Sequence, residues 1–537
     1  MPESTFVPAQ SSGTAAPGRQ GWWTVAVVTI ATFMLMLDLT VINVALPSVR
    51  DDLDADFAGL QWVIDSYALT LAAFLLTAGS LADRFGRRRT FNAGFAVFSL
   101  ASLACGLAPG ITELIIARAV QGVGAAVLFA VGPALIGAAF QGKARSAAFG
   151  VFGAGAGLAI AAGPLIGGAL ASGPGWRWIF LVNVPVGVVA TVLGMGWMNE
   201  SKSRASHPVD WAGLIAFTVG LAAVVYALLR GGADGWTSPS ILATGTAGVL
   251  FLLAFVVVER RRGAAAMLDS SLFRIRTFTG LSVIAALISA GSMSAIFLLV
   301  SYVQNSYGFS PWETGLRFLP MTIALFVMAA LGGALTAKVP HNILLFVSCL
   351  APAAGLALVP LTLETSSPWT VLLPCTLAMG VGLGLFNPVR AYLAVGVVEP
   401  ADAGAASGMN ETFQQAGMAL GIAALGALFQ NRATSAFLER DLGNQFAGGD
   451  DLGGQIAAGA VPSLPAGASV DASALAAALQ SATVSGLNAT LPWCAALCAL
   501  GAAVALVSIR RSDLHPSAIG AVPGVPPTVE SVTDSAS

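Results

Sequence analysis

The chain has 537 residues, of which 56% are hydrophobic and only 10% are charged, and its mean hydropathy is +0.80. Soluble proteins carry about 25% charged residues, so this composition excludes a soluble multidomain protein and indicates an integral membrane protein. The net charge of −2 excludes the basic surface that nucleic-acid binding requires, and we expect no nucleic-acid partner.

The composition also offers no catalytic or cofactor site. The five cysteines fall in apolar runs without metal-ligand spacing to a histidine, so we interpret them as core residues. No nucleophile–base pair and no Walker-type phosphate loop occurs, and the glycine patterns belong to no strand–helix unit. We expect no enzyme activity and no cofactor. The first 21 residues are polar and do not resemble a secretory signal peptide, so the first span should direct insertion.

Apolar runs of roughly 20 residues are long enough for a helix to cross a bilayer core of ~30 Å. The sequence predicts an all-α fold with fourteen such spans: 22–47, 60–82, 90–108, 111–138, 146–171, 178–198, 211–229, 238–258, 280–303, 314–337, 342–361, 369–395, 404–429 and 489–509.

A charged motif, Gly79–Arg89 (G-S-L-A-D-R-F-G-R-R-R), separates the second span from the third. It carries four arginines against one aspartate, so we predict a short loop on the cytoplasmic side. This placement puts eighteen of the twenty-five lysines and arginines in the cytoplasm and six outside. The bias predicts that both termini are cytoplasmic in a multi-pass bacterial cell-membrane protein.

These spans divide the chain into predicted units. They are a cytoplasmic tail (1–21), a six-helix bundle (22–198), a linker (199–279) with two additional helices (211–229 and 238–258), a second six-helix bundle (280–509) with a long outer loop (430–488), and a disordered cytoplasmic tail (510–537).

The second half repeats part of the first. The stretch Gly333–His341 follows the tenth span as Gly79–Arg87 follows the second, with Ala337 where Asp83 stands. Two pseudo-symmetric halves with a site between them suit alternating access, in which the site opens to one side of the membrane at a time.

Several stretches together identify a family. They are L-D-L-T-V-I-N-V-A-L-P (37–47), the charged motif, A-R-A-V-Q-G-V-G-A-A (117–126), the glycine-rich run 153–168 and G-W-R-W-I-F-L-V-N-V-P-V-G (175–187). The chain strongly resembles the major facilitator superfamily, in its fourteen-helix drug:proton antiporter branch. The resemblance covers all fourteen spans, although the motifs lie in the first half, and the fifth-span motif implies export.

Two intramembrane charges are candidates for proton coupling. Asp38 lies about 24 Å along the first span, and Arg118 lies about 10 Å into the fourth span from the opposite direction, so the two can reach the same depth. An intramembrane carboxylate is costly and usually functional. The resemblance assigns such a pair to coupling; the alternatives are hydrogen bonds of Asp38 to neighbouring side chains and of Arg118 to backbone carbonyls.

Two groups of residues are candidates for gating. In the charged motif these are Gly79, Asp83, Arg84, Gly86 and Arg87, whose spacing the resemblance implies to be an inner gate. The alternative is that the arginines only set the topology. In the fifth span, Gly163 and Pro164 mark a weak point at which the helix can bend.

Polar residues in other spans are candidates for contact with the substrate: Asn43, Asp65, Tyr302, Gln304, Glu411 and Gln415. Asp65 could also bind a proton or be an interfacial carboxylate, and the polar residues around Glu411 could equally serve helix–helix hydrogen bonding.

We therefore expect a monomeric antiporter, driven by the proton gradient, that exports hydrophobic or amphipathic small molecules such as cationic drugs. The alternatives are an exporter of a lipid or cell-envelope precursor and a non-transporting membrane receptor.

Overall fold

The structure is a computed structural model of the chain, and it describes residues 19–515 apart from 56, 141, 202–210, 236, 263–269, 400–401 and 440–471. The described residues form helices and turns and include no strand. The long helices are α1 (Arg19–Leu53), α2 (Phe57–Phe85), α3 (Arg87–Gly106), α4 (Ile111–Ala139), α5 (Gly142–Ser172), α6 (Arg177–Leu181) with α7 (Asn183–Trp197), α8 (Trp211–Asp234), α9 (Pro239–Arg262), α10 (Arg276–Tyr307), α11 (Pro311–Thr336), α12 (His341–Thr362), α13 (Leu373–Gly396), α14 (Ala403–Leu438) and α16 (Ala472–Ser508).

Ten of these helices, within the described residues, are long and apolar enough to cross a membrane. An eleventh candidate is α2, which bends by 50° between Trp62–Leu75 and Thr77–Phe85. The predicted spans 90–108, 146–171 and 211–229 coincide with α3, α5 and α8, which lie outside that set. The all-helical membrane architecture is thus confirmed, whereas the count of fourteen spans and the side on which the termini lie stay predictions.

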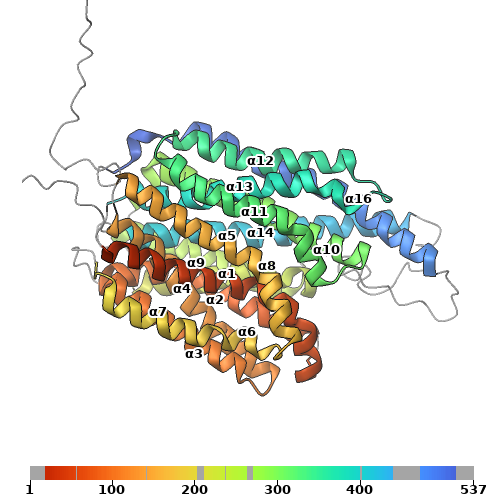
Figure 1. The fold of residues 1–537 in the computed structure, drawn as a ribbon, viewed down its shortest axis with the longest axis horizontal. Helices are drawn as coiled ribbons and strands as arrows, with labels where there is room; N and C mark the ends of the chain where they lie inside the picture. The colour runs from red at the N-terminus through yellow and green to blue at the C-terminus, as the bar shows by residue number, and fades with distance from the viewer. Residues whose placement is uncertain are drawn as a thin grey trace, which may run out of the picture.

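The same neighbour pattern occurs twice along the chain. In the first set α2 packs on α4, α3 on α4 and α7, and α1 on α5. In the second set α11 packs on α13, α12 on α13 and α16, and α10 on α14. Figure 1 shows the helices running alongside one another, with the red-to-yellow helices α1–α7 grouped below the green-to-blue helices α10–α16. We call these groups the first and second halves.

The halves meet along two seams, α2 with α14 and α5 with α11. Glycines bring the backbones close at both seams: a Cβ on Gly79 would lie 2.4 Å from the Gly404 carbonyl oxygen, and one on Gly333 would lie 2.4 Å from the Gly150 Cα. The inserted helices α8 and α9 pair with each other, and α8 packs on both α2 and α14.

The charged motif is more helical than predicted. Helix α2 continues to Phe85 and α3 begins at Arg87, so Gly86 alone separates the two helices. Gly86 has φ 107, a left-handed conformation that glycine adopts without a steric penalty. The short loop predicted between spans 60–82 and 90–108 was therefore too long; one glycine makes the turn. We call the end of the molecule that carries Gly86 the motif end, and the opposite end the far end.

The predicted outer loop 430–488 is also too long. Helix α14 continues to Leu438 and α16 begins at Ala472, so 430–438 and 472–488 are helical. Leu475 is buried in α16. The start of α16 is rich in alanine, which favours helix although it is not strongly apolar. A run of strongly apolar residues therefore does not reveal where this helix begins. Residues 440–471 and both predicted tails, apart from 19–21 and 510–515, lie outside the described residues.

Candidate functional site

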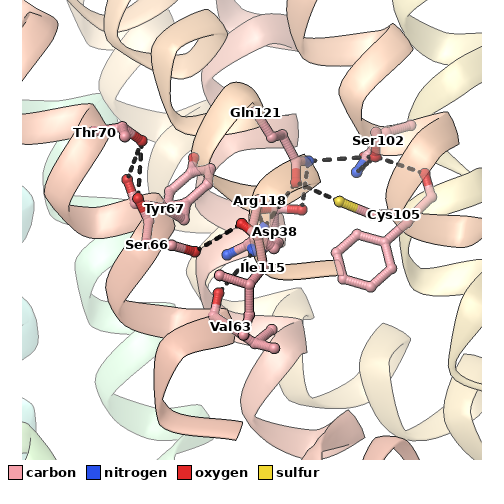
Figure 2. Close-up of polar contacts among 12 residues, drawn as sticks. Asp38, Val63, Ser66, Tyr67, Thr70, Ser102, Cys105, Ile115, Arg118 and Gln121 are labelled. Atoms are coloured by element: carbon pink, nitrogen blue, oxygen red, sulfur yellow. Dashed lines mark hydrogen bonds and ion pairs between the residues drawn. The ribbon is translucent and has the colours of Figure 1, made fainter. Parts of the chain in front are cut away.

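Asp38 of α1 and Arg118 of α4 form a buried ion pair inside the first half. Arg118 Nη1 donates to Asp38 Oδ2 at 2.5 Å, and no more than 1% of either side chain is exposed. The helical rise placed the two residues at matching depths, and helices α1 and α4 pack together. Figure 2 shows the two side chains turned toward each other. The structure thus brings together the residues predicted for coupling.

Gln121, one turn after Arg118, completes the contacts of the pair. Its Nε2 donates to Asp38 Oδ1 at 3.0 Å, and its Oε1 accepts from Arg118 Nη1 at 2.9 Å (Figure 2). Gln121 Nε2 also reaches the Ser102 hydroxyl at 3.3 Å, and that hydroxyl accepts from Asn183 at 3.2 Å. Both oxygens of the carboxylate therefore accept from buried donors, and the network connects α1 and α4 to α3 and α7.

Arg118 also has partners that do not depend on the carboxylate. Its Nε donates to the Val63 carbonyl at 3.1 Å, and its guanidinium lies 4.2 Å from the Tyr67 ring centroid and 5.7 Å from that of Phe180. The Tyr67 hydroxyl is buried and has no hydrogen-bond partner among the described residues. Aromatic faces attract a desolvated guanidinium by roughly 2 kcal/mol. Arg118 can thus keep part of its stabilisation when Asp38 becomes neutral.

The Asp38–Arg118 pair is arranged so that a change in the charge of Asp38 affects the packing of the helices around it. Removing one partner of a buried ion pair costs about 3–5 kcal/mol, because the other charge is left uncompensated. A proton on Asp38 neutralises the carboxylate without displacing it, and the attraction between α1 and α4 weakens. Because Arg118 is anchored to α2 through Val63, such a change acts on three helices of the first half.

At the motif end, Asp83 connects the two halves. Its carboxylate accepts from the backbone nitrogens of Gly404 at 3.2 Å and Ala405 at 2.9 Å, in the first turn of α14. Arg87, 2% exposed, donates through Nε to Asp83 Oδ1 at 2.8 Å. An acidic group at a helix N-terminus is favourable because the first N–H groups lack helical partners. We call Asp83, Arg87 and the start of α14 the carboxylate clamp.

The other residues of the charged motif serve the turn between α2 and α3. Glu200, after α7, accepts from the backbone nitrogens of Arg88 at 3.1 Å and Arg89 at 3.3 Å. A Cβ on Gly86 would lie 2.6 Å from a Glu200 carboxylate oxygen, so a larger residue would displace Glu200. Arg84 is exposed and lies over the Phe85 ring. Only Arg87 of the four arginines pairs with Asp83 among the described contacts.

Glu411 of α14 forms a second buried ion pair, with Arg390 of α13. Arg390 Nη2 donates to Glu411 Oε2 at 2.7 Å, and its Nη1 donates to Asn410 at 2.8 Å. Both side chains are less than 10% exposed, and Gln415, one turn further, is also buried. The structure does not bring this pair into the Asp38 network. Helix–helix bonding, the alternative weighed for the Glu411 region, is present here.

Asp65 of α2 differs from the other buried carboxylates. It is 7% exposed, and its Oδ2 has no hydrogen-bond partner among the described residues. Aromatic rings lie close by on the same helix face, where Trp62 packs on Tyr226 of α8 at 5.7 Å and under Arg230 at 5.7 Å. Asp65 therefore has a buried oxygen without a hydrogen-bond partner among the described residues, and the positive charge of Arg230 acts on its carboxylate.

The remaining candidates are placed as follows. Tyr302 is buried in the second half and meets the Tyr307 hydroxyl at 3.3 Å, while Gln304 is half-buried nearby on α10. Gly163 is buried within an uninterrupted α5, and the side chains of Pro164 and Asn43 lie outside the described residues. The five cysteines are buried and free, and no group of three or more metal-ligating side chains occurs in the described part.

Sequence reasoning missed Gln121, Tyr67 and Arg390. Gln121 belongs to the A-R-A-V-Q-G run, and its spacing of three from Arg118 places the two on one helix face, a signal that was available. Arg390 lies near the end of the predicted span 369–395, where an arginine usually indicates the cytoplasmic side and not an internal ion pair. Tyr67 has no signal in the sequence, since its contact depends on the rotation of α2 against α4.

The family model for the Major Facilitator Superfamily matches residues 28–422. The puromycin resistance protein of Streptomyces alboniger is 37% identical over 81% of this chain and 87% of its own. The tetracenomycin C resistance and export protein of Streptomyces glaucescens is 31% identical over 94% and 95%. The multidrug resistance protein Stp of Mycobacterium tuberculosis is 34% identical over 74% of each chain.

Solved structures share the fold at low identity. The human organic anion transporter MFSD10 aligns with a TM-score of 0.58 at 12% identity, covering 90% of this chain and 99% of that one. The proton:xylose symporter XylE aligns with a TM-score of 0.55 at 15% identity, covering 80% and 92%. The chain is a multi-pass membrane protein, and it belongs to the major facilitator superfamily.

Proposed function

We propose that this protein exports amphipathic antibiotics or drugs in exchange for protons, by alternating access between its two halves. The observation that carries the proposal is the buried Asp38–Arg118 pair, in which a carboxylate able to take a proton connects two helices of one half. The names of the resistance and export relatives support drug export over a lipid exporter or a receptor.

The proposed cycle starts from the state described here, in which both seams between the halves are closed at the motif end. Gly79 contacts Gly404 and Gly333 contacts Gly150, and Asp83 caps α14. We propose that the motif end faces the cytoplasm and that fourteen helices span the membrane. A proton arriving at Asp38 from outside would weaken the pair with Arg118, and this would favour the state open to the cytoplasm. Substrate binding there would promote release of the proton.

We propose Asp65 as the first candidate for contact with a cationic substrate, because one of its oxygens is unused and aromatic rings lie nearby. Glu411 is a weaker candidate, since Arg390 already neutralises it. Asn43, Tyr302, Gln304 and Gln415 remain candidates for lining the path.

Uptake of puromycin and ethidium into inside-out vesicles tests the proposal. With an acidic lumen, wild-type vesicles should accumulate both compounds, and a protonophore should abolish accumulation. Asp38→Asn should lose accumulation while remaining folded. Accumulation that persists without a proton gradient contradicts antiport, and failure to accumulate either compound contradicts drug export as proposed.

A further inference from the structure

The repeated sequence places two equivalent positions at the seams, but only one of them carries a carboxylate. Asp83 follows Gly79 by one turn and caps α14. In the second half Ala337 follows Gly333 by one turn, so the start of α5 receives no matching carboxylate. The α5 seam therefore lacks the carboxylate clamp, although its glycine contact is equally close.

A stack of side chains occupies the motif end of this second seam. The guanidinium of Arg145, near the start of α5, lies 5.4 Å from the ring centroid of Tyr392 on α13. His341, the first residue of α12, stacks on the same ring at 5.5 Å and 9°. Phe149, one turn after Arg145, meets Tyr392 edge-on at 6.2 Å and 88°. Arg145 and Phe149 come from the first half, and Tyr392 and His341 from the second.

Arg145 is buried in an unusual environment. It is 3% exposed, its Nε has no hydrogen-bond partner, and no carboxylate pairs with it among the described residues. A buried charge without a partner is costly, and an aromatic face returns part of that cost. The ring that does so belongs to the opposite half. Tyr392 therefore offsets part of the cost of burying Arg145 only while the seam is closed.

The stack also separates readily. When the halves move apart at the motif end, water can reach Arg145 and replace the lost cation–π contact, so no charge is stranded. The equilibrium between the closed and open states then depends on the Tyr392 ring, which contacts Arg145 only in the closed state. His341 stands at the position of Arg87 in the repeat, so each half uses the same sequence position near its contact with the other.

We propose that Arg145, Tyr392 and His341 form a second gate at the motif end, the counterpart of the carboxylate clamp in different chemistry. The gate is formed in the state described here and broken when the site opens to that end. The inference rests on the proposed alternating access.

Spin labels at the motif ends of the two halves test the gate in liposomes. Met195→Cys on α7 and Ile343→Cys on α12 are suitable because both residues are exposed, and the five native cysteines are buried. Tyr392→Leu should raise the ratio of long to short label distances about five-fold if the cation–π contact counts as an exposed one and about thirty-fold if it counts as a desolvated one. Tyr392→Phe keeps the aromatic ring and should shift the distances much less than Tyr392→Leu does.

Two further variants separate the possible failures. Arg145→Gln removes the cation together with its desolvation cost, so in that background Tyr392→Leu, or Tyr392→Met if Tyr392→Leu does not fold, should shift the distances much less than in wild type. Asp83→Asn breaks the carboxylate clamp and should open the motif end independently. A shift in Asp83→Asn without one in Tyr392→Leu, or a Tyr392→Leu shift that is unchanged in the Arg145→Gln background, overturns the gate and leaves alternating access standing. No shift in any variant or with puromycin contradicts alternating access, and the gate with it.

Discussion

At the scale of single residues, the Asp38–Arg118 pair is the most constrained feature of the first half. Both groups are buried, and Gln121 and Val63 satisfy the polar atoms around them. We expect Arg118→Gln to lower the free energy of unfolding by about 3–5 kcal/mol, because it strands the carboxylate of Asp38. Thermal unfolding in detergent would measure the loss.

The matched control is the neutral double variant Asp38→Asn with Arg118→Gln. It buries two amides and no charge, so it should recover most of the stability while transport stays lost. If the double variant is as unstable as Arg118→Gln alone, the shape of the arginine rather than its charge maintains the packing.

A second residue-scale prediction concerns the far end, outside the membrane-spanning segments. Hydrogen bonds from Arg177 and Trp176 lower the pKa of Asp52 below its ordinary value. Folding therefore favours the ionised form, and the contact stabilises the fold at neutral pH and is lost as the pH falls through the lowered pKa. We expect wild type to have a higher Tm than Asp52→Asn at pH 7, and the difference to shrink below about pH 3.9.

If wild type and Asp52→Asn differ in Tm by the same amount at pH 7 and at pH 3, this assignment is contradicted. The difference would then come from the packing of the side chain and not from its charge. The wild-type and Asp52→Asn melts, repeated in high salt, give an independent check, because the contact is exposed and should weaken with screening.

Residue depth was predictable from the sequence, and residue partners were not. The fixed rise of a helix puts Asp38 and Arg118 at one level, so their meeting could be foreseen. The pairing of Arg390 with Glu411 could not, because it depends on how α13 and α14 are rotated about their axes. Tyr67 is unpredictable for the same reason.

At the scale of helices, glycine determines how closely the seams pack. A Cβ on Gly79 would overlap the backbone of α14, which cannot give way as a flexible side chain can. We expect Gly79→Ala to separate α2 from α14 at the motif end, to cost about 1–3 kcal/mol and to reduce transport strongly. Drug uptake into vesicles and thermal unfolding measure the two effects.

Gly196→Ala, in α7, is the matched control, because nothing lies within 4 Å of the added Cβ. Its transport and stability should match wild type. Equal behaviour of Gly79→Ala and Gly196→Ala would show that the α2–α14 seam tolerates a methyl group and would contradict the close packing described here.

Helix positions were predicted better than helix ends. Apolar runs located each of the long helices, but they ended α2 too early and began α16 too late. Helix α2 continues past the apolar run because Asp83 accepts hydrogen bonds from the start of α14 there. The start of α16 is helical because alanine favours helix without being strongly apolar. Hydropathy locates the part of a helix that lies in the membrane interior, and it does not show where the helix ends outside it.

At the scale of the whole molecule, the two halves repeat their helix pairing but differ in their charges. The first half holds Asp38 with Arg118 and contributes the carboxylate clamp, while the second holds Glu411 with Arg390 and contributes Tyr392 and His341. The sequence repeat after the second and tenth spans predicted two related halves, and the structure places the two repeated stretches at equivalent seams. It could not predict what replaces Asp83 at Ala337, because Arg145 and Tyr392 lie far from the repeat in sequence.

Proton release by purified protein on addition of puromycin, followed with a pH-sensitive dye, tests the central claim most directly. Wild type should release protons and Asp38→Asn should release none although it is folded. Asp65→Asn should still release them, but only at higher puromycin concentrations, because it weakens contact with the substrate and leaves the buried pair intact. Release that survives in Asp38→Asn and disappears in Asp65→Asn would contradict the account, because it would place the transported proton on α2 instead of on the buried pair.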